Sequence, residues 1–147
     1  MKTRRRSRPL LALLFILAPG LSCEKKSETG TKPVDFVTEI KPILQGRCID
    51  CHHSGALFGE VNLENRAMAL QSHKKGPAIT PGDPQQSRLY IVLTLPDPSP
   101  KAMPPMAHRI SNAEVELVKR WIQEGAKWPE GPDGTIKPSP AHEKGKV

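Results

Sequence analysis

Apolar side chains recur at helical spacing in several stretches between residues 34 and 129. In residues 34–44 they return every three or four positions, which predicts a helix with one apolar face. Pro42 lies inside this stretch, so we expect the helix to be kinked or to end early. Two shorter apolar patterns follow Asn65 and Ser87, whose side chains suit the N-cap positions of two short helices.

The clearest pattern predicts a helix between Ser111 and Gly125. Ser111 and Glu114 form a capping box, in which each side chain can bond the backbone N–H of the other residue. The apolar face that follows carries Val115, Val118, Trp121 and Ile122. Gly125 favours a helix end. Since proline- and glycine-rich loops separate these helices, the pattern predicts an all-α, loop-rich domain over residues 34–129.

The two ends of the chain lack such patterns. Residues 1–22 begin with basic side chains and continue into an apolar run too short to span a bilayer, as in an export signal peptide. Residues 23–33 are polar and small, which indicates a flexible tether. Residues 130–147 are rich in proline, glycine and lysine, which predicts a disordered tail.

Cys23 follows the apolar run and resembles the lipidated cysteine of bacterial lipoproteins. Gly20 stands where such proteins usually have a large aliphatic residue, so cleavage by an ordinary signal peptidase is the alternative. Lipidation is favoured because an unpaired thiol is a liability in an oxidising compartment. We therefore expect an exported protein, in the periplasm or on the outer surface, anchored in the membrane by a lipid at Cys23.

The formal net charge of +7 belongs mostly to the leader, because five basic residues and no acids lie in residues 1–22. The remainder is close to neutral, which does not indicate a nucleic-acid-binding surface.

Cys48-Ile49-Asp50-Cys51-His52 is the motif that constrains the chemistry most. Two thiols spaced by two residues can form thioethers with the two vinyl groups of a haem, and the adjacent histidine can then bind the iron. This C-x-x-C-H spacing is the attachment signature of haem c. A C-x-x-C pair alone would also suit a thioredoxin-like redox motif or half of a zinc site. The redox motif expects a preceding strand, and the zinc site expects a second pair of ligands.

The composition favours the haem interpretation. The chain is 37% apolar but only 4% aromatic, and it contains 16 prolines. A domain of about 95 residues with so few rings buries little apolar surface on its own. We therefore expect a small helical domain wrapped around one covalently attached haem, which supplies much of the core.

Met103 is the preferred second ligand of the iron. It precedes two prolines, so it lies on a stiff loop that can hold a weak iron–sulfur bond. Met106 and His108 are the competing ligands. His53 directly follows the proximal ligand and is expected to be exposed to solvent.

The order of these motifs resembles the planctomycete-type cytochrome c domain. The resemblance covers residues 34–129 and rests on four motifs besides the cysteines: Ile40–Leu44, Pro81–Pro84 with Ser87–Tyr90, Met103–Pro105 and Trp121–Pro129. It implies a class I cytochrome c-like helical fold, with Met103 opposite His52 on the iron.

The resemblance also implies two further contacts. The His52 ring N–H that does not face the iron should donate to the carbonyl of Pro81, or alternatively of Pro77. Trp121 should pack against the N-terminal helix or the haem edge.

Together these features predict a monohaem cytochrome that passes single electrons between redox protein partners. No Ser/His/Asp set, paired carboxylates near His52 or phosphate-binding loop indicates an enzyme. Two alternatives stay open: a haem enzyme or gas sensor with an open distal site, and a haem-stabilised binding module at a surface.

Overall fold

The computed structural model describes residues 32–71, 76–105 and 108–140. The predicted signal peptide, Cys23 and Met106 lie outside these ranges. Within the described ranges, no helix combines the length and the apolar character needed to cross a membrane.

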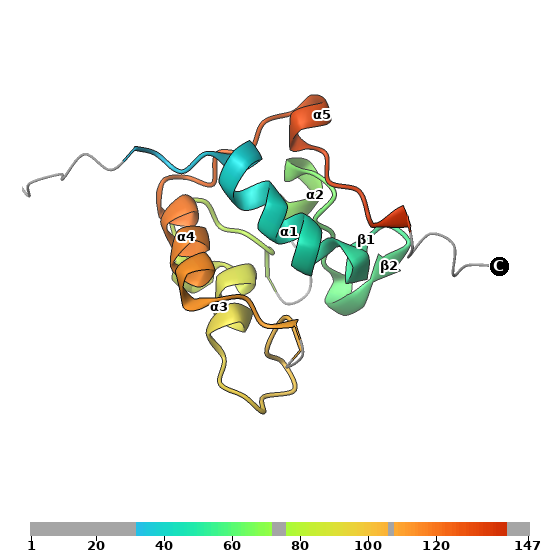
Figure 1. Ribbon diagram of the computed structural model, residues 1–147, viewed down its shortest axis with the longest axis vertical. Helices are drawn as coiled ribbons and strands as arrows, with labels where there is room; N and C mark the ends of the chain where they lie inside the picture. The colour runs from blue at the N-terminus through green and yellow to red at the C-terminus, as the bar shows by residue number, and fades with distance from the viewer. Residues whose placement is uncertain (1–31, 72–75, 106–107, 141–147) are drawn as a thin grey trace, which may run out of the picture. The chain divides into compact units, whose positions relative to one another are not determined.

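The first helix begins with a wide turn and continues past Pro42 (Figure 1). Its π-helical part, η1, spans Phe36–Ile40, and α1 spans Lys41–Arg47. Asp35 caps the start, since its carboxylate accepts hydrogen bonds from the backbone nitrogen and the hydroxyl of Thr38 at 2.8 and 2.7 Å. Pro42 has no N–H to donate, and a wide turn next to it lets the helix continue. The helix therefore does not end early.

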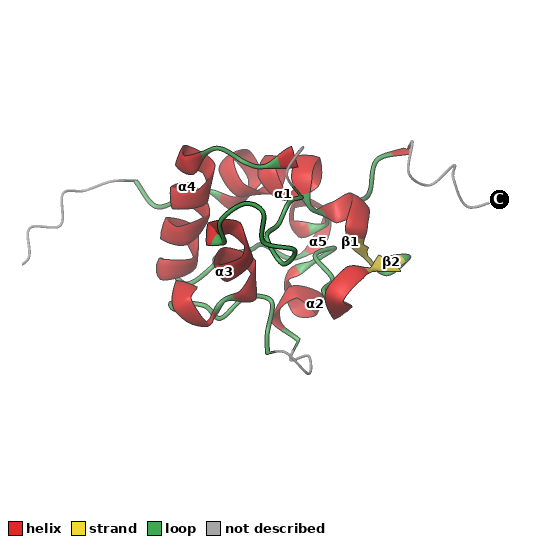
Figure 2. Cartoon of the chain, turned by 90° about the horizontal axis from the view of Figure 1, so that it is seen from below, coloured by secondary structure: helices red, strands yellow, loops and turns green. Residues whose placement is uncertain are grey.

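The cysteine motif leads directly into a short hairpin. A 3-10 turn, η2, spans Ile49–Cys51. Strand β1, His52–His53, then pairs antiparallel with β2, Ala56–Leu57. A further 3-10 turn, η3, spans Phe58–Glu60. The described domain is thus mainly helical but carries one small sheet, which the all-α prediction lacked (Figure 2).

The next two helices differ in how they are capped. Helix α2, Arg66–Leu70, begins as predicted, with the Asn65 side chain accepting from the backbone of Met68 at 3.0 Å. Helix α3, Arg88–Thr94, follows the 3-10 turn η4, Pro84–Gln86. Ser87 does not cap α3 with its side chain. Its buried hydroxyl accepts from the backbone of Thr80 at 2.9 Å and donates to the Asp83 carbonyl at 2.8 Å, which ties α3 to the preceding loop.

Helix α4, Asn112–Gln123, has the predicted capping box at Ser111 and Glu114. It ends where Gly125 adopts a φ of +96°, a left-handed conformation that glycine adopts without strain. This is the longest helix of the described domain, and it packs against η1 and α3.

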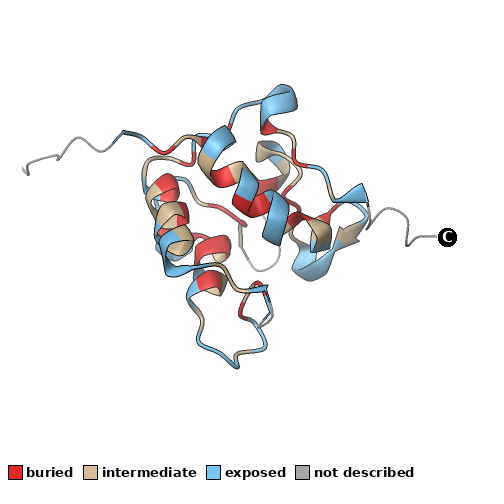
Figure 3. Cartoon of the chain, viewed as in Figure 1, coloured by how far each residue is buried: buried red, intermediate tan, exposed pale blue. Residues whose placement is uncertain are grey.

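The core is centred on three aromatic rings. Phe36 stacks on Trp128 with ring centroids 4.5 Å apart, and the Trp121 ring lies 5.8 Å from Phe36 and 5.9 Å from Trp128. Trp121 is fully buried, and its indole N–H donates to the Lys127 carbonyl at 2.9 Å. Trp121 therefore contacts the N-terminal helix, one of its two predicted neighbours. Figure 3 shows that α1, α3 and α4 each carry buried residues interspersed with more exposed ones.

Residues 130–140 pack on the domain, whereas the sequence predicted a disordered tail from residue 130. Helix α5 spans Gly131–Gly134, and Ile136 behind it is only 1% exposed. The Ile136 N–H donates to the Glu64 carbonyl at 2.8 Å, and the Trp128 indole donates to the Gly134 carbonyl at 2.7 Å. One buried isoleucine and a set of backbone bonds fix a segment whose composition is typical of disorder.

Candidate functional site

The two cysteines of the motif lie on one short turn after α1. The Cys48 N–H donates to the Leu44 carbonyl at 3.0 Å, and the Cys51 N–H donates to the Cys48 carbonyl at 3.2 Å. Both thiols are free; Cys48 is half-buried and Cys51 is exposed. The turn that ends α1 therefore presents two thiols of one segment, followed at once by a histidine.

The Cys48 thiol is held in its protonated form. Burial, with a smaller contribution from Cys51, raises the pKa of Cys48 from 9.0 to about 12. Thioredoxin-like motifs depend on a thiol whose pKa is lowered. The site therefore does not have the electrostatics of a thiol–disulfide exchange centre.

His52 is half-buried and is held in its neutral form. Burial is the main cause that lowers its pKa; the nearby Arg88 guanidinium acts in the same direction, and the backbone of Phe58 and Val61 opposes it. A neutral imidazole is the form that binds metals. Its Nδ1 atom is buried and has no hydrogen-bond partner among the described residues.

The Nδ1 atom of His52 donates to no proline carbonyl among the described residues. The backbone beside the ring belongs to Phe58 and Val61, and neither Pro81 nor Pro77 accepts a bond from it within the described ranges. Pro81 lies in an exposed turn, where the next residue, Gly82, donates to the Ile122 carbonyl of α4 at 2.7 Å.

His53 is buried, which contradicts the expectation that it is exposed. Its Nδ1 atom accepts the N–H of Gly55 at 3.1 Å. The hairpin turn between β1 and β2 thus directs this ring inward, although it directly follows His52.

Arg88 lies beside His52, although the sequence indicated it only as part of the Ser87–Tyr90 motif. Its Nη2 atom donates to the Gly59 carbonyl at 3.3 Å, and its Nη1 atom is buried without a partner in the described part of the chain. Its charge acts on the pKa of His52, which places a cation beside the imidazole. A single basic residue at the start of a predicted helix does not indicate that its side chain lies near His52.

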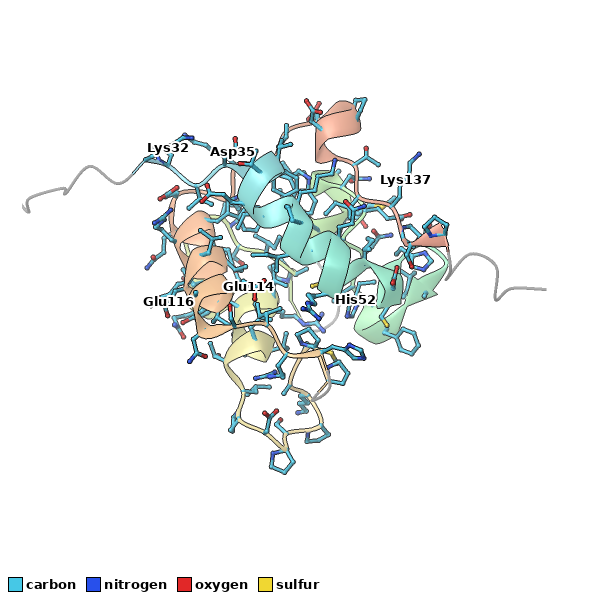
Figure 4. All side chains as sticks on the ribbon, in the orientation of Figure 1. Lys32, Asp35, His52, Glu114, Glu116 and Lys137 are labelled. Atoms are coloured by element: carbon cyan, nitrogen blue, oxygen red, sulfur yellow. The ribbon has the colours of Figure 1, made fainter. Side chains whose placement is uncertain are left out.

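Met103 lies on the loop between α3 and α4. Its N–H donates to the Val92 carbonyl of α3 at 2.9 Å, and its own carbonyl accepts from the guanidinium of Arg109 at 2.9 Å. The side chain of Met103 is half-buried, and its peptide bond to Pro104 is cis. His108, one of the competing ligands, is exposed. Figure 4 shows His52 beyond the end of α1, on the side that faces this loop.

Two large apolar side chains are exposed beside the motif. Leu57 on β2 is 53% exposed and Phe58 on η3 is 63% exposed, while Leu57 is the register partner of His52. Exposed apolar groups next to free thiols suit contact with a flat apolar ligand.

The described residues do not supply the second ligand pair of a zinc site. Nowhere in these ranges do three or more His, Cys, Asp or Glu side chains gather in a metal-binding arrangement. A haem needs fewer protein groups of this kind, because the porphyrin itself provides four ligands of the iron.

The family model of planctomycete cytochrome C matches residues 48–106, from the first cysteine of the motif to just beyond Met103. This match confirms the resemblance seen in the sequence for the segment that carries the C-x-x-C-H motif and Met103. Searches of the curated proteins and of the solved structures found no significant match.

The residues present fit a haem c. Two free thiols lie on one turn, a neutral imidazole follows them, and two buried nitrogens beside them, Nδ1 of His52 and Nη1 of Arg88, lack partners among the described residues. Buried polar atoms are normally hydrogen-bonded or bound to a ligand. An iron and a carboxylate are groups of the kind that an imidazole nitrogen and a guanidinium bind.

Proposed function

We propose that this protein is an exported monohaem c-type cytochrome that carries single electrons between redox proteins. Cys48 and Cys51 would hold the haem by thioether bonds, and His52 and Met103 would bind its iron. The haem would supply the one-electron chemistry, while the protein sets its environment. The observation that carries this proposal is the turn with two free thiols and a neutral imidazole, inside the segment that matches the family.

The residues around the motif would tune the carrier. Methionine opposite histidine raises the reduction potential relative to ligands that donate more electron density. Arg88 would bind a haem propionate, because its unpartnered, buried Nη1 atom is a charge-assisted donor. The exposed Leu57 and Phe58 would lie along the haem edge.

Export and membrane anchoring are supported by the leader sequence. A lipid on Cys23 would hold the domain at a membrane surface, and residues 24–33 would act as the tether. Cys23→Ala should move the protein from the membrane fraction to the soluble fraction of the periplasm or medium. Retention of the variant in the membrane fraction would contradict a lipid at this residue.

Mass spectrometry of the denatured protein tests haem attachment. After expression with the cytochrome c maturation factors, the full chain should weigh one haem more than its polypeptide and any lipid, and show a Soret band. The double variant Cys48→Ala/Cys51→Ala should lose the added mass. A correctly processed wild-type chain with the bare polypeptide mass would refute the proposal.

The oxidised optical spectrum tests the distal ligand. The weak long-wavelength band of an iron–methionine bond should be present in the wild type and in Met106→Ala, and absent in Met103→Ala. Persistence in Met103→Ala with loss in Met106→Ala would assign the bond to Met106. A five-coordinate ferric spectrum in the wild type would favour a haem enzyme or gas sensor.

Electron transfer itself needs a kinetic test. The reduced protein should be reoxidised rapidly by a small redox protein mixed with it in a stopped-flow instrument. Reoxidation that remains slow with protein and small-molecule acceptors would favour a haem-stabilised binding module.

A further inference from the structure

We propose that Arg109 is a positioning residue that holds the Met103 loop in the conformation in which methionine binds iron. The inference rests on the proposed ligation by Met103. It assigns a role to a residue outside the segment that matches the family and outside the motifs that carry the resemblance.

The guanidinium of Arg109 joins the start of this loop to Met103. Its Nη1 atom donates to the Met103 carbonyl at 2.9 Å. Its Nη2 atom donates to the carbonyls of Leu93 and Leu95, at the C-terminal end of α3, at 3.2 and 2.8 Å. The side chain itself is only 25% exposed. The backbone where the loop leaves α3 and the backbone where it reaches the methionine are therefore fixed to the same group.

The Met103 backbone is held from two sides. Its N–H donates to the Val92 carbonyl, and its carbonyl accepts from Arg109. Because a thioether is a weak iron ligand, its binding depends on a small entropy loss when the loop is ordered. Without the bond from Arg109, the formation of the iron–sulfur bond would have to order more of the loop, which should weaken that bond.

Arginine is the residue type that this arrangement requires. Three backbone carbonyls converge on one side chain, and a planar guanidinium presents five N–H donors in a fixed fork. A lysine ammonium at Arg109 would keep the charge but not the fork, so it should restore only part of the effect.

The ion pair between Arg109 and Asp97 is secondary. Its closest atoms, Nε of Arg109 and Oδ1 of Asp97, are 3.7 Å apart, and the Asp97 side chain is 51% exposed. Exposed pairs of this kind contribute little because solvent screens them. The carbonyl bonds, rather than this pair, should determine the position of Met103, and Asp97→Asn separates the two.

The experiment compares the iron–methionine bond with the overall fold in the haem-loaded full chain. The variants are Arg109→Ala, Arg109→Lys and Asp97→Asn, with Lys119→Ala as a control. Lys119 carries the same charge on α4 and pairs there with Glu116 at 3.1 Å. The iron–methionine band and the far-ultraviolet circular dichroism are recorded as the denaturant guanidinium chloride is added. The affinity for carbon monoxide is measured on the reduced protein.

In Arg109→Ala, the iron–methionine band should disappear at a lower concentration of guanidinium chloride than the helical circular dichroism signal does. The affinity for carbon monoxide, which competes with the thioether, should rise about tenfold, the effect of losing charge-assisted hydrogen bonds. Arg109→Lys should show an intermediate rise even if Arg109→Ala matures poorly. Asp97→Asn and Lys119→Ala should match the wild type.

Two results would overturn the inference, and they differ in what else they remove. In the first, the band depends on Met103, but both Arg109 variants have the wild-type midpoint in guanidinium chloride and the wild-type affinity for carbon monoxide. This result overturns the role of Arg109 and leaves the ligation by Met103 in place. A haem-loaded wild type whose band does not depend on Met103 overturns that role together with the proposed ligation. The presence of haem in either case is read separately, from the mass and the Soret band.

Discussion

Asp50 accepts two hydrogen bonds from Ser139, from the backbone nitrogen at 2.7 Å and from the hydroxyl at 3.1 Å. Asp50 stands between the two cysteines of the motif, and Ser139 lies near the end of the described residues. The segment that follows α5 is thus fastened directly to the turn that carries the thiols. This contact gives an otherwise unspecified position of the C-x-x-C-H motif a structural role.

Asp50→Ala should therefore lower the free energy of unfolding by about 1 kcal/mol, since both acceptor bonds are lost. Ser139→Ala removes only the hydroxyl bond, so it should cost less. Asp133→Ala, which removes an exposed carboxylate from the same C-terminal segment, is the control. Guanidinium unfolding of the haem-loaded proteins measures the differences; equal values for Asp50→Ala and Asp133→Ala would contradict the role of this contact.

Gly134 should not tolerate a side chain. A Cβ built on it would collide with the carbonyl oxygen of Pro129 and lie 3.1 Å from Cδ1 of Trp128. Gly134→Ala must shift backbone at this contact, which we expect to lower the free energy of unfolding by about 1–3 kcal/mol.

Gly46→Ala is the matched control for this prediction. Gly46 lies in α1, where an added Cβ has open space around it. Alanine should stabilise the helix there by about 0.5–1 kcal/mol. The two variants should therefore move the thermal unfolding midpoint in opposite directions, and a shift of the same sign would refute the packing argument.

The capping box of α4 should make stability depend on pH. Hydrogen bonds from the backbone and hydroxyl of Ser111 hold the pKa of Glu114 below its ordinary value of 4.5. Because the folded pKa is the lower one, the box stabilises the protein above pH 4.5 and loses this contribution as the pH falls through the folded pKa.

Ser111→Ala removes the hydroxyl bond to Glu114 but keeps the backbone N–H bond, so it should flatten this part of the pH profile only in part. It should also weaken the N-cap by about 1 kcal/mol. The difference in unfolding free energy between variant and wild type should shrink as the pH is lowered below 4.5. A difference that stays constant over that range would show that the Ser111 hydroxyl does not lower the pKa of Glu114.

Arg88→Gln should lower the reduction potential of the haem. The oxidised haem carries one more positive charge than the reduced one, so removing a nearby cation favours oxidation. We expect a shift on the order of tens of millivolts from a change of one partly buried charge. Lys119→Gln removes an equal charge from the exposed surface of α4 and should leave the potential unchanged in the same spectroelectrochemical titration.

Local determinants allowed the sequence to predict part of this structure. The capping box at Ser111, the helical period after it and the stop at Gly125 are all contained in one stretch of chain, and the predicted helix is present. The same holds for the Asn65 cap. The helix predicted after Ser87 is also present, with Ser87 at its N-cap position, but the side-chain capping bond is not formed. The partners of the Ser87 hydroxyl, Thr80 and Asp83, belong to a loop that a local cap rule does not consider.

Long-range contacts explain the remaining differences. Ile136 is a single apolar residue in a segment of prolines, glycines and lysines, and only the folded chain shows it buried beside Glu64. The role of Arg109 depends on three backbone carbonyls. Every residue has such a carbonyl, so the sequence does not indicate which of them a side chain will bond. The thiols and imidazole of the site could be predicted because their chemistry requires a fixed spacing.

The aromatic cluster of Phe36, Trp121 and Trp128 has a spectroscopic consequence. Both tryptophans of the chain lie in it, and it joins the first helix to the segment after α4. Tryptophan fluorescence therefore arises from this one cluster, and its change during denaturation reports the separation of the first helix from α4 and the segment after it. The same signal, followed in time, would measure how quickly these two segments pack together during folding.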